Sequence, residues 1–113
     1  MDIDKQTQEK LQELQLREQN LQNFLLQKQA FQIELNEVDS AIEETEKSKD
    51  DMYKIVGQVM IKAEKQETLK DLKEKKKILD MRIKAIENQE KILQSKLDSL
   101  KKELESSIKS KEK

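Results

Sequence analysis

The sequence predicts a mainly α fold: an antiparallel two-helix coiled-coil hairpin with a short β-hairpin at its bend. Three observations predict it: two heptad tracts of equal length, the absence of proline, and one short segment between the tracts that is rich in β-branched residues. We expect an N-terminal helix over residues 1–51, a β-hairpin over 52–63 and a C-terminal helix over 64–113. Together these elements form a single predicted domain of 113 residues.

The first heptad tract covers roughly 39 residues, which is about 58 Å of helix at 1.5 Å per residue. With 42% charged and 34% hydrophobic residues, the chain is polar enough for disorder to be a competing interpretation. A disordered polar chain, however, has no reason to space its apolar residues at a mean interval of 3.5. The a and d positions in order are Leu14, Arg17, Leu21, Phe24, Lys28, Phe31, Leu35, Val38, Ile42, Thr45, Lys49 and Met52.

The second tract has the same length, so the two predicted helices can pair along their whole repeat. Leucine, lysine, glutamate and glutamine favour the helical state in both tracts. Its a and d positions are Leu69, Leu72, Lys76, Leu79, Ile83, Ile86, Glu90, Leu93, Leu97, Leu100, Leu104 and Ser107.

Charged residues interrupt both tracts at Arg17, Lys28, Lys49, Lys76 and Glu90. Long side chains at such positions can extend to water and fix the register, at some loss of stability. If the end of the first tract lies opposite the start of the second, Lys28 and Glu90 are about one turn apart. That register predicts an ion pair between the two helices.

The two halves of the chain differ in charge. Residues 1–50 carry a net charge of −6 and residues 51–113 a net charge of +5, which together give −1. An acidic helix and a basic helix favour pairing, within one chain or between chains. Each exposed pair contributes only about 0.2–1 kcal/mol, but many pairs together can set the orientation.

The segment between the tracts reads as two strands, 52–56 and 59–63, joined by a tight turn at Gly57-Gln58. An isolated two-stranded hairpin is only marginally stable in water. Both faces of this one carry apolar side chains, and both outer edges lack a partner strand. We therefore expect the hairpin to be completed by strands of other chains.

Further apolar residues lie outside the a and d positions of both tracts. Two interpretations stay open: ordinary exposed apolar residues, which any surface carries, or a contact face for a neighbouring coil or a non-native protein. These residues are Leu16, Leu26, Ala30 and Ile33 in the first tract and Ile78, Met81, Ala85 and Ile92 in the second.

Several function classes are not expected. The chain has no cysteine and no histidine, so thiol chemistry and the usual zinc ligand sets are excluded. Carboxylate pairs such as Glu43 and Glu44 lie on a predicted solvated face, where nothing separates their pKa values for catalysis. The lysine run over residues 73–77 lacks nearby aromatic residues for stacking on nucleic acid. No apolar run reaches membrane-spanning length, and no leader is visible, so we expect a soluble, cytoplasmic protein that is not an enzyme, with no cofactor and no nucleic-acid or membrane partner.

The central segment and its flanks resemble the beta-type subunits of the prefoldin family, most closely the archaeal members. The resemblance covers roughly residues 10–105. It rests most specifically on residues 53–57 (YKIVG) and 82–91 (RIKAIENQEK), and it extends over 27–29, 32–35, 60–62 and 69–75.

This resemblance implies an ATP-independent co-chaperone, a holdase. In prefoldins, two alpha-type and four beta-type subunits form a hexamer whose hairpins build an intersubunit β-barrel. The coiled coils extend from that platform, and their free ends hold non-native polypeptides for delivery to a group II chaperonin. The implied partners of this chain are therefore alpha-type subunits, further copies of itself, non-native proteins and the chaperonin.

Two groups of residues carry these implied roles. The oligomerisation hairpin comprises Tyr53, Ile55, Val56, Gly57, Val59, Met60 and Ile61. The client-binding ends comprise Leu11, Leu14, Leu16, Leu21, Leu100, Leu104 and Ile108. For the leucines, packing between the two helices is an equally good interpretation. The alternative function is a structural coiled-coil linker or dimerisation protein without client-holding activity, in which the hairpin is only a bend.

Overall fold

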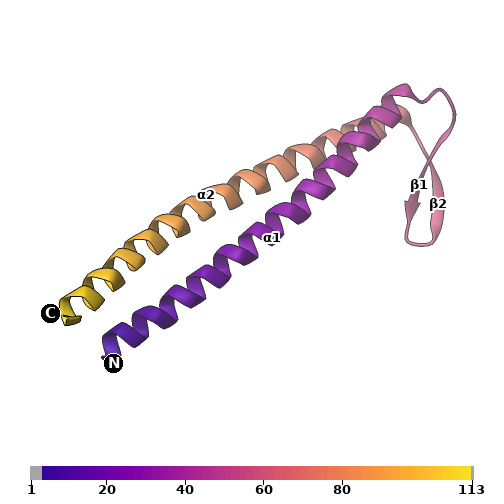
Figure 1. Cartoon of the computed structure of the whole chain (residues 1–113). Helices are drawn as coiled ribbons and strands as arrows, with labels where there is room; N and C mark the ends of the chain where they lie inside the picture. Colours follow the sequence, from indigo (N-terminus) through magenta and orange to yellow (C-terminus); the bar gives the residue numbers. More distant parts are fainter. Residues whose placement is uncertain (1–3, 113) are drawn as a thin grey trace. The chain divides into compact units, whose positions relative to one another are not determined.

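The computed structural model describes the backbone of residues 4–112 and the side chains as far as Ile108. Helix α1 runs over Lys5–Lys47, strand β1 over Met52–Val56, strand β2 over Val59–Ala63 and helix α2 over Lys65–Glu112. Figure 1 shows β1 and β2 as a hairpin that connects the end of α1 to the start of α2. The predicted fold class of two long helices joined by a β-hairpin is confirmed.

The residues group into two compact units, each formed from both helices. Unit 1 comprises residues up to 28 and from 85 onward, and unit 2 comprises residues 29–84, including the hairpin. The assignment of the whole chain to one domain stays a prediction.

Helix α1 begins at a capping residue. The Asp4 carboxylate accepts a hydrogen bond from the backbone N–H of Thr7 at 2.8 Å, and the Asp4 carbonyl accepts one from Gln8 at 3.0 Å. An aspartate in this position satisfies a backbone donor that has no partner inside the helix. At the other end α1 stops at Lys47, before the predicted helix end at residue 51, and residues 48–51 form a non-helical link to β1.

Burial follows the predicted heptads. Every a and d position of the second tract is buried or half-buried, and in the first tract only Lys49 is exposed. The period arises because a 3.5-residue repeat keeps one helix face turned toward its partner. The buried apolar side chains of unit 1 are Ile86, Leu93, Leu97, Leu100 and Leu104, and those of unit 2 are Val38, Leu79 and Ile83.

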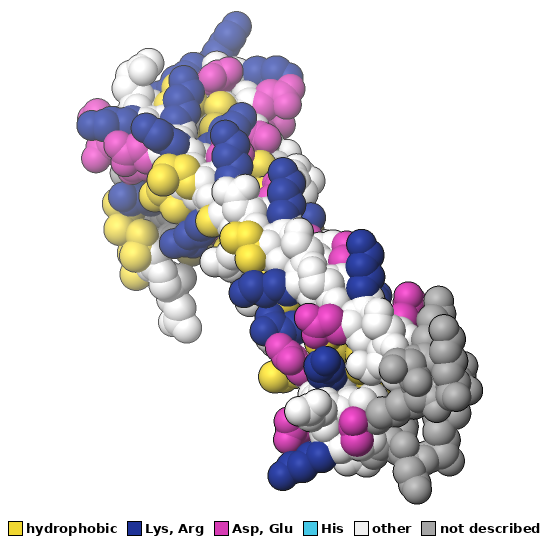
Figure 2. All heavy atoms as spheres, turned by 90° about the vertical axis from the view of Figure 1, so that its left-hand side faces the viewer, with side chains coloured by type: hydrophobic (Ala, Val, Ile, Leu, Met, Phe, Trp, Pro, Cys, Tyr) yellow, Lys and Arg dark blue, Asp and Glu magenta, His cyan; other side chains and the backbone are white. Residues whose placement is uncertain are grey.

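Ion pairs between the helices follow the predicted charge asymmetry in unit 2, whereas two of the three described pairs in unit 1, Lys10–Glu103 and Lys28–Glu90, have the lysine on α1. Of six such pairs among the described residues, four join an acidic side chain of α1 to a lysine of α2. Figure 2 shows lysine and arginine side chains (dark blue) interspersed with acidic ones (magenta) over the helices. The four pairs are Glu18–Lys101 in unit 1 and Glu34–Lys75, Asp39–Lys76 and Glu46–Lys73 in unit 2.

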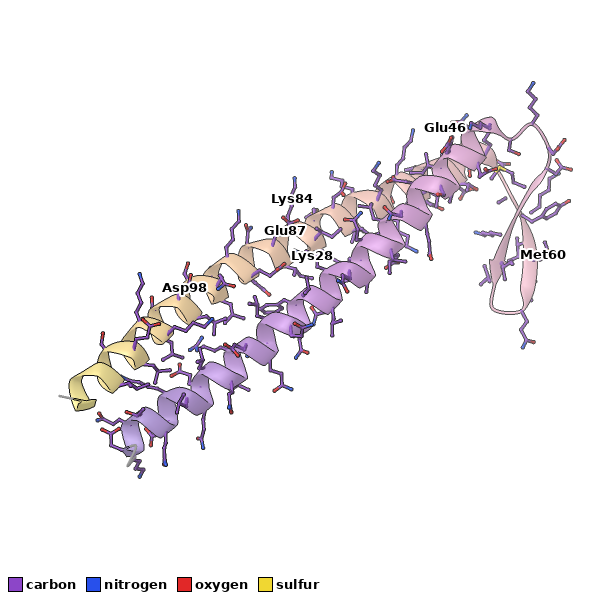
Figure 3. The ribbon with its side chains drawn as sticks, in the orientation of Figure 1. Lys28, Glu46, Met60, Lys84, Glu87 and Asp98 are labelled. Atoms are coloured by element: carbon purple, nitrogen blue, oxygen red, sulfur yellow. The ribbon has the colours of Figure 1, made fainter. Side chains whose placement is uncertain are left out.

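The predicted ion pair between Lys28 and Glu90 is present in unit 1. Lys28 Nζ lies 2.9 Å from Glu90 Oε1 and donates a hydrogen bond to Oε2 at 3.3 Å. Both side chains are only 20–31% exposed, so water screens the pair less than it screens a surface pair. Figure 3 labels Lys28 on α1. A charged pair inside an apolar seam is a known device for fixing register.

Candidate functional site

The β-hairpin of unit 2 is the most exposed apolar part of the chain that the structure describes. Its strands pair antiparallel with Met52 opposite Ala63 and Val56 opposite Val59, in the register predicted from the sequence. The two-residue loop leaves Gly57 with a φ of 62°, a conformation that glycine adopts without a steric penalty. A glycine in the first loop position matches the type II′ turn, whose twist suits a two-residue hairpin.

The pairing register assigns each side chain to a face, because directly opposed residues share one side of a sheet. One face carries Tyr53, Ile55, Met60 and Lys62. The other face carries Lys54, Val56, Val59 and Ile61, together with the terminal pair Met52 and Ala63. Each face therefore holds three large apolar side chains and one lysine between the terminal pair and the turn.

None of these apolar side chains is covered. Ile55 is 73% exposed and Met60 66% exposed, and Tyr53, Val56, Val59 and Ile61 are exposed as well. Met60 is labelled on the hairpin in Figure 3. Fully burying a side chain of this kind contributes about 1.5–3 kcal/mol. The hairpin thus leaves a large apolar surface exposed, and burying that surface in contact with another chain would be favourable.

The sheet has only two strands, so its outer edges also offer unpaired backbone donors and acceptors. A second chain that adds a strand satisfies these groups and covers apolar side chains in the same step. Both properties of the hairpin, its edges and its faces, suit association between chains.

The predicted client-binding residues lie in unit 1 and differ in exposure. Leu16 is 58% exposed and Ile108 40% exposed, whereas Leu100 and Leu104 are buried between the helices. The remaining three, Leu11, Leu14 and Leu21, are half-buried. Of these seven side chains, therefore, only Leu16 and Ile108 are exposed. The client-binding role of the whole group stays a prediction.

Two residues that the sequence did not single out make notable contacts, one in unit 1 and one in unit 2. Leu25 is exposed at the edge of an open groove in unit 1 that Leu21 and Leu97 also line. It occupies an apolar position directly after the d residue Phe24, which is a weak signal for a widened contact stripe. Lys65 donates hydrogen bonds to carbonyl oxygens at the end of α1. The sequence signal that could have found it is a lysine at the first residue of a helix, where an acidic residue is favoured.

The outer apolar residues are exposed as the heptads predict: Leu16, Leu26 and Ile92 in unit 1, and Ile33, Ile78 and Met81 in unit 2. Their exposure agrees with both interpretations of them.

No described helix is long and apolar enough to cross a membrane. Among the described residues, no three acidic side chains gather in a way that could hold a metal ion.

One lysine in unit 2 has a perturbed proton affinity. Lys76 Nζ lies 2.8 Å from Asp39 Oδ1. The hydrogen bond to Asp39 and the attraction of its negative charge raise the pKa of Lys76 above its ordinary value of 10.5. The pair places a charged residue at a heptad position of α2 where the apolar repeat is interrupted.

Comparison with known proteins agrees with this geometry. The family described as "Prefoldin subunit" matches residues 5–111. The chain is 43% identical to a prefoldin subunit beta of Thermococcus gammatolerans over 109 residues, which cover 95% of this chain and 93% of that protein. It is 37% identical to a prefoldin subunit beta of Pyrococcus furiosus, with coverage of 94% and 92%.

A solved structure shows the same fold. The crystal structure of the prefoldin beta subunit from Thermococcus strain KS-1 superimposes with a TM-score of 0.86 at 37% identity, covering 94% of this chain and 95% of that one. The likeness therefore spans both helices and the hairpin.

Proposed function

This chain belongs to the prefoldin family, and we propose that it is the beta-type subunit of a hetero-hexamer with two alpha and four beta subunits. The observation that carries this proposal is the exposed hairpin, whose two apolar faces and two open edges lack partners among the residues that the structure describes. Strands from neighbouring subunits would close it into an intersubunit β-barrel. Closure into a barrel removes sheet edges altogether.

The proposed activity is that of an ATP-independent holdase in the cytoplasm, with residues 1–113 as one domain. Non-native polypeptides would be captured at the ends of the helices farthest along the chain from the hairpin, and passed to a group II chaperonin. Apolar contacts of this kind are non-directional and scale with buried area, so they suit clients of many sequences.

The exposure of the seven client-binding residues divides this proposal into two steps. Leu16 and Ile108 are available for a first contact without any rearrangement. Leu100 and Leu104 become available only if the ends of the helices separate, and helix ends are where local opening requires the least free energy. Capture would therefore combine a fixed apolar contact with a transient opening.

The test of the holdase is light scattering of a denatured client diluted into buffer with this chain and an alpha-type partner, without ATP. We expect near-stoichiometric amounts of the assembly to suppress aggregation. Undiminished aggregation, despite a verified hexamer, would instead favour a structural coiled-coil linker.

A truncated chain without residues 1–14 and 105–113 tests where the client is held. We expect it to form an assembly with the same number of subunits and to lose most of the suppression, because Leu11, Leu14 and Ile108 are removed. Full suppression by the truncated chain would show that the helix ends are not the contact sites.

A further inference from the structure

The junction between α1 and the hairpin lacks the usual closure of a helix end. The last four carbonyls of a helix have no partner inside it. A left-handed residue just past the end, usually glycine, commonly satisfies some of them. Among the described residues only Gly57 has a positive φ, and it lies in the turn of the hairpin. The backbone N–H of Ser48 donates a hydrogen bond to the Thr45 carbonyl at 3.3 Å, and a further donor at the end of α1 would satisfy carbonyls that remain.

Lys65 supplies that donor from the other side of the hairpin. Its Nζ donates hydrogen bonds to the carbonyl oxygens of Glu46 at 2.9 Å and Ser48 at 3.2 Å. The position of Glu46 near the end of α1 is labelled in Figure 3. A positive charge is favourable here, because the carbonyl end of a helix carries partial negative charge. The bond to Glu46 is exposed, and the bond to Ser48 is partly buried, which limits competition from water at the second contact.

This placement opposes the preference of the helix to which Lys65 belongs. Lys65 is the first residue of α2, where the partial charge of the helix is positive and an acidic residue is favoured. Glu67 in the same turn follows that preference, and Lys65 does not. A local choice that conflicts with its own element indicates a role elsewhere in the fold.

Both ends of the hairpin lie beside this contact. Strand β1 begins at Met52, shortly after Ser48, and β2 ends at Ala63, two residues before Lys65. Met52 and Ala63 form the pair farthest from the turn. One side chain thus joins the exit from α1 to the entry into α2, and the hairpin emerges between the two joined points.

We propose that Lys65 is a positioning residue that fixes the direction in which the hairpin leaves the two helices of unit 2. A hairpin held in one direction presents its apolar faces already oriented, so less freedom is lost when another chain binds. The consequence for association rests on the proposed assembly through the hairpin. The orientation itself does not depend on it.

The absence of cysteine allows a direct distance measurement by site-specific spin labelling. Labels at Lys54→Cys on β1 and Glu37→Cys on α1 report the hairpin against its helix in the full chain, and both positions are exposed. Lys65→Met removes the donor, Lys65→Arg keeps a charged donor, and Lys70→Met is a matched control that removes an exposed lysine from the same helix. Circular dichroism verifies helix content in each variant.

We expect one narrow distance distribution for the unsubstituted Lys65 chain, Lys65→Arg and Lys70→Met, and a clearly broader one for Lys65→Met. The same variant should associate with an alpha-type partner about tenfold more weakly, with unchanged hairpin side chains. A narrow distribution for Lys65→Met, or equal broadening for Lys70→Met, overturns the proposal. Broadening without weaker association overturns its consequence for assembly. If the parent chain does not associate at all, the proposed function fails while the distance measurement still decides the role of Lys65.

Discussion

Two regions of the molecule use the same kinds of apolar side chain in opposite ways. One is the seam, the a and d residues along which the two helices pack, and the other is the β-hairpin. In unit 1, Leu97 is only 1% exposed because α1 covers it, whereas in unit 2 Ile55 on the hairpin is 73% exposed. The seam finds its partner within the chain. The apolar faces and open edges of the hairpin have no partner in the described part of the chain.

This difference separates the free energy of folding of the chain from the free energy of its association with other chains. Substitutions in the seam should lower the stability of the folded chain, because buried contacts are lost. Substitutions on the hairpin should leave that stability almost unchanged, because its apolar side chains are exposed in the folded chain. They should instead affect association, because the contacts proposed for the hairpin are with other chains.

The largest expected effect concerns the hairpin. Replacing Ile55 and Val59 together with lysine puts one new charge on each face, since the two residues lie on opposite sides of the sheet. Association with an alpha-type partner should weaken on the order of a thousandfold, because the loss of two apolar contacts of about 1.5–3 kcal/mol each adds to the desolvation of the new charges. Mass photometry measures it.

Helix content in that variant should stay close to that of the parent chain, as circular dichroism would show. Lys54→Gln, on the same hairpin, is the control and should associate normally. Unchanged association of the double variant would contradict the assignment of the hairpin as the interface.

The next effect concerns the seam. Leu97→Ala should lower the free energy of unfolding by about 2–5 kcal/mol, because it leaves a cavity between the helices. Leu26→Ala, on an exposed position of the same unit, should change it by less than about 0.5 kcal/mol. Urea unfolding followed by circular dichroism measures both, at one protein concentration because association adds apparent stability. Equal losses in the two variants would show that the seam is not the core.

A smaller effect concerns the ion pair inside the seam. Lys28→Leu alone leaves the half-buried Glu90 carboxylate without its lysine and should lower stability by about 1–3 kcal/mol. Adding Glu90→Leu should recover most or all of that loss, since an apolar pair replaces a buried charged pair well. The same urea titration gives the coupling between the sites. Additive losses would mean that the two side chains do not depend on each other.

The smallest effect is a pH dependence in unit 2. Asp39 raises the pKa of Lys76 above 10.5, so the stabilisation is fully present below the unfolded value of 10.5. It is lost as the pH rises through the raised value of the folded chain. The stability difference between the parent chain and Lys76→Gln should therefore be constant to about pH 9 and shrink above it. A difference that grows with pH would contradict this sign.

The sequence predicted the fold well because its signals are local and periodic. The heptad spacing alone placed Leu79, Ile83 and Leu97 inside, and the alternation around Gly57 gave the strands and their turn. The ion pair of Lys28 with Glu90 followed from register alone. These features depend on spacing along the chain, which a sequence displays directly.

The junction was harder to predict because it depends on contacts between residues far apart in sequence. Lys65 reaches the carbonyl of Glu46, and nothing in its own neighbourhood indicates that contact except an unfavourable place in its helix. The proposed client-binding residues were implied by the family resemblance and assigned to apolar residues near the helix ends, and apolar character does not distinguish the buried Leu104 from the exposed Leu16. Only packing makes that distinction, and packing depends on the partner helix.

The most direct test of the account is the mass of the assembly formed by this chain and an alpha-type prefoldin subunit, measured by native mass spectrometry. The account predicts a single dominant species with the two alpha and four beta chains of the proposed hexamer, because the open edges and apolar faces of the hairpin are covered only when strands of other subunits complete it. Separate chains, or dimers of this chain alone at all mixing ratios, would contradict it.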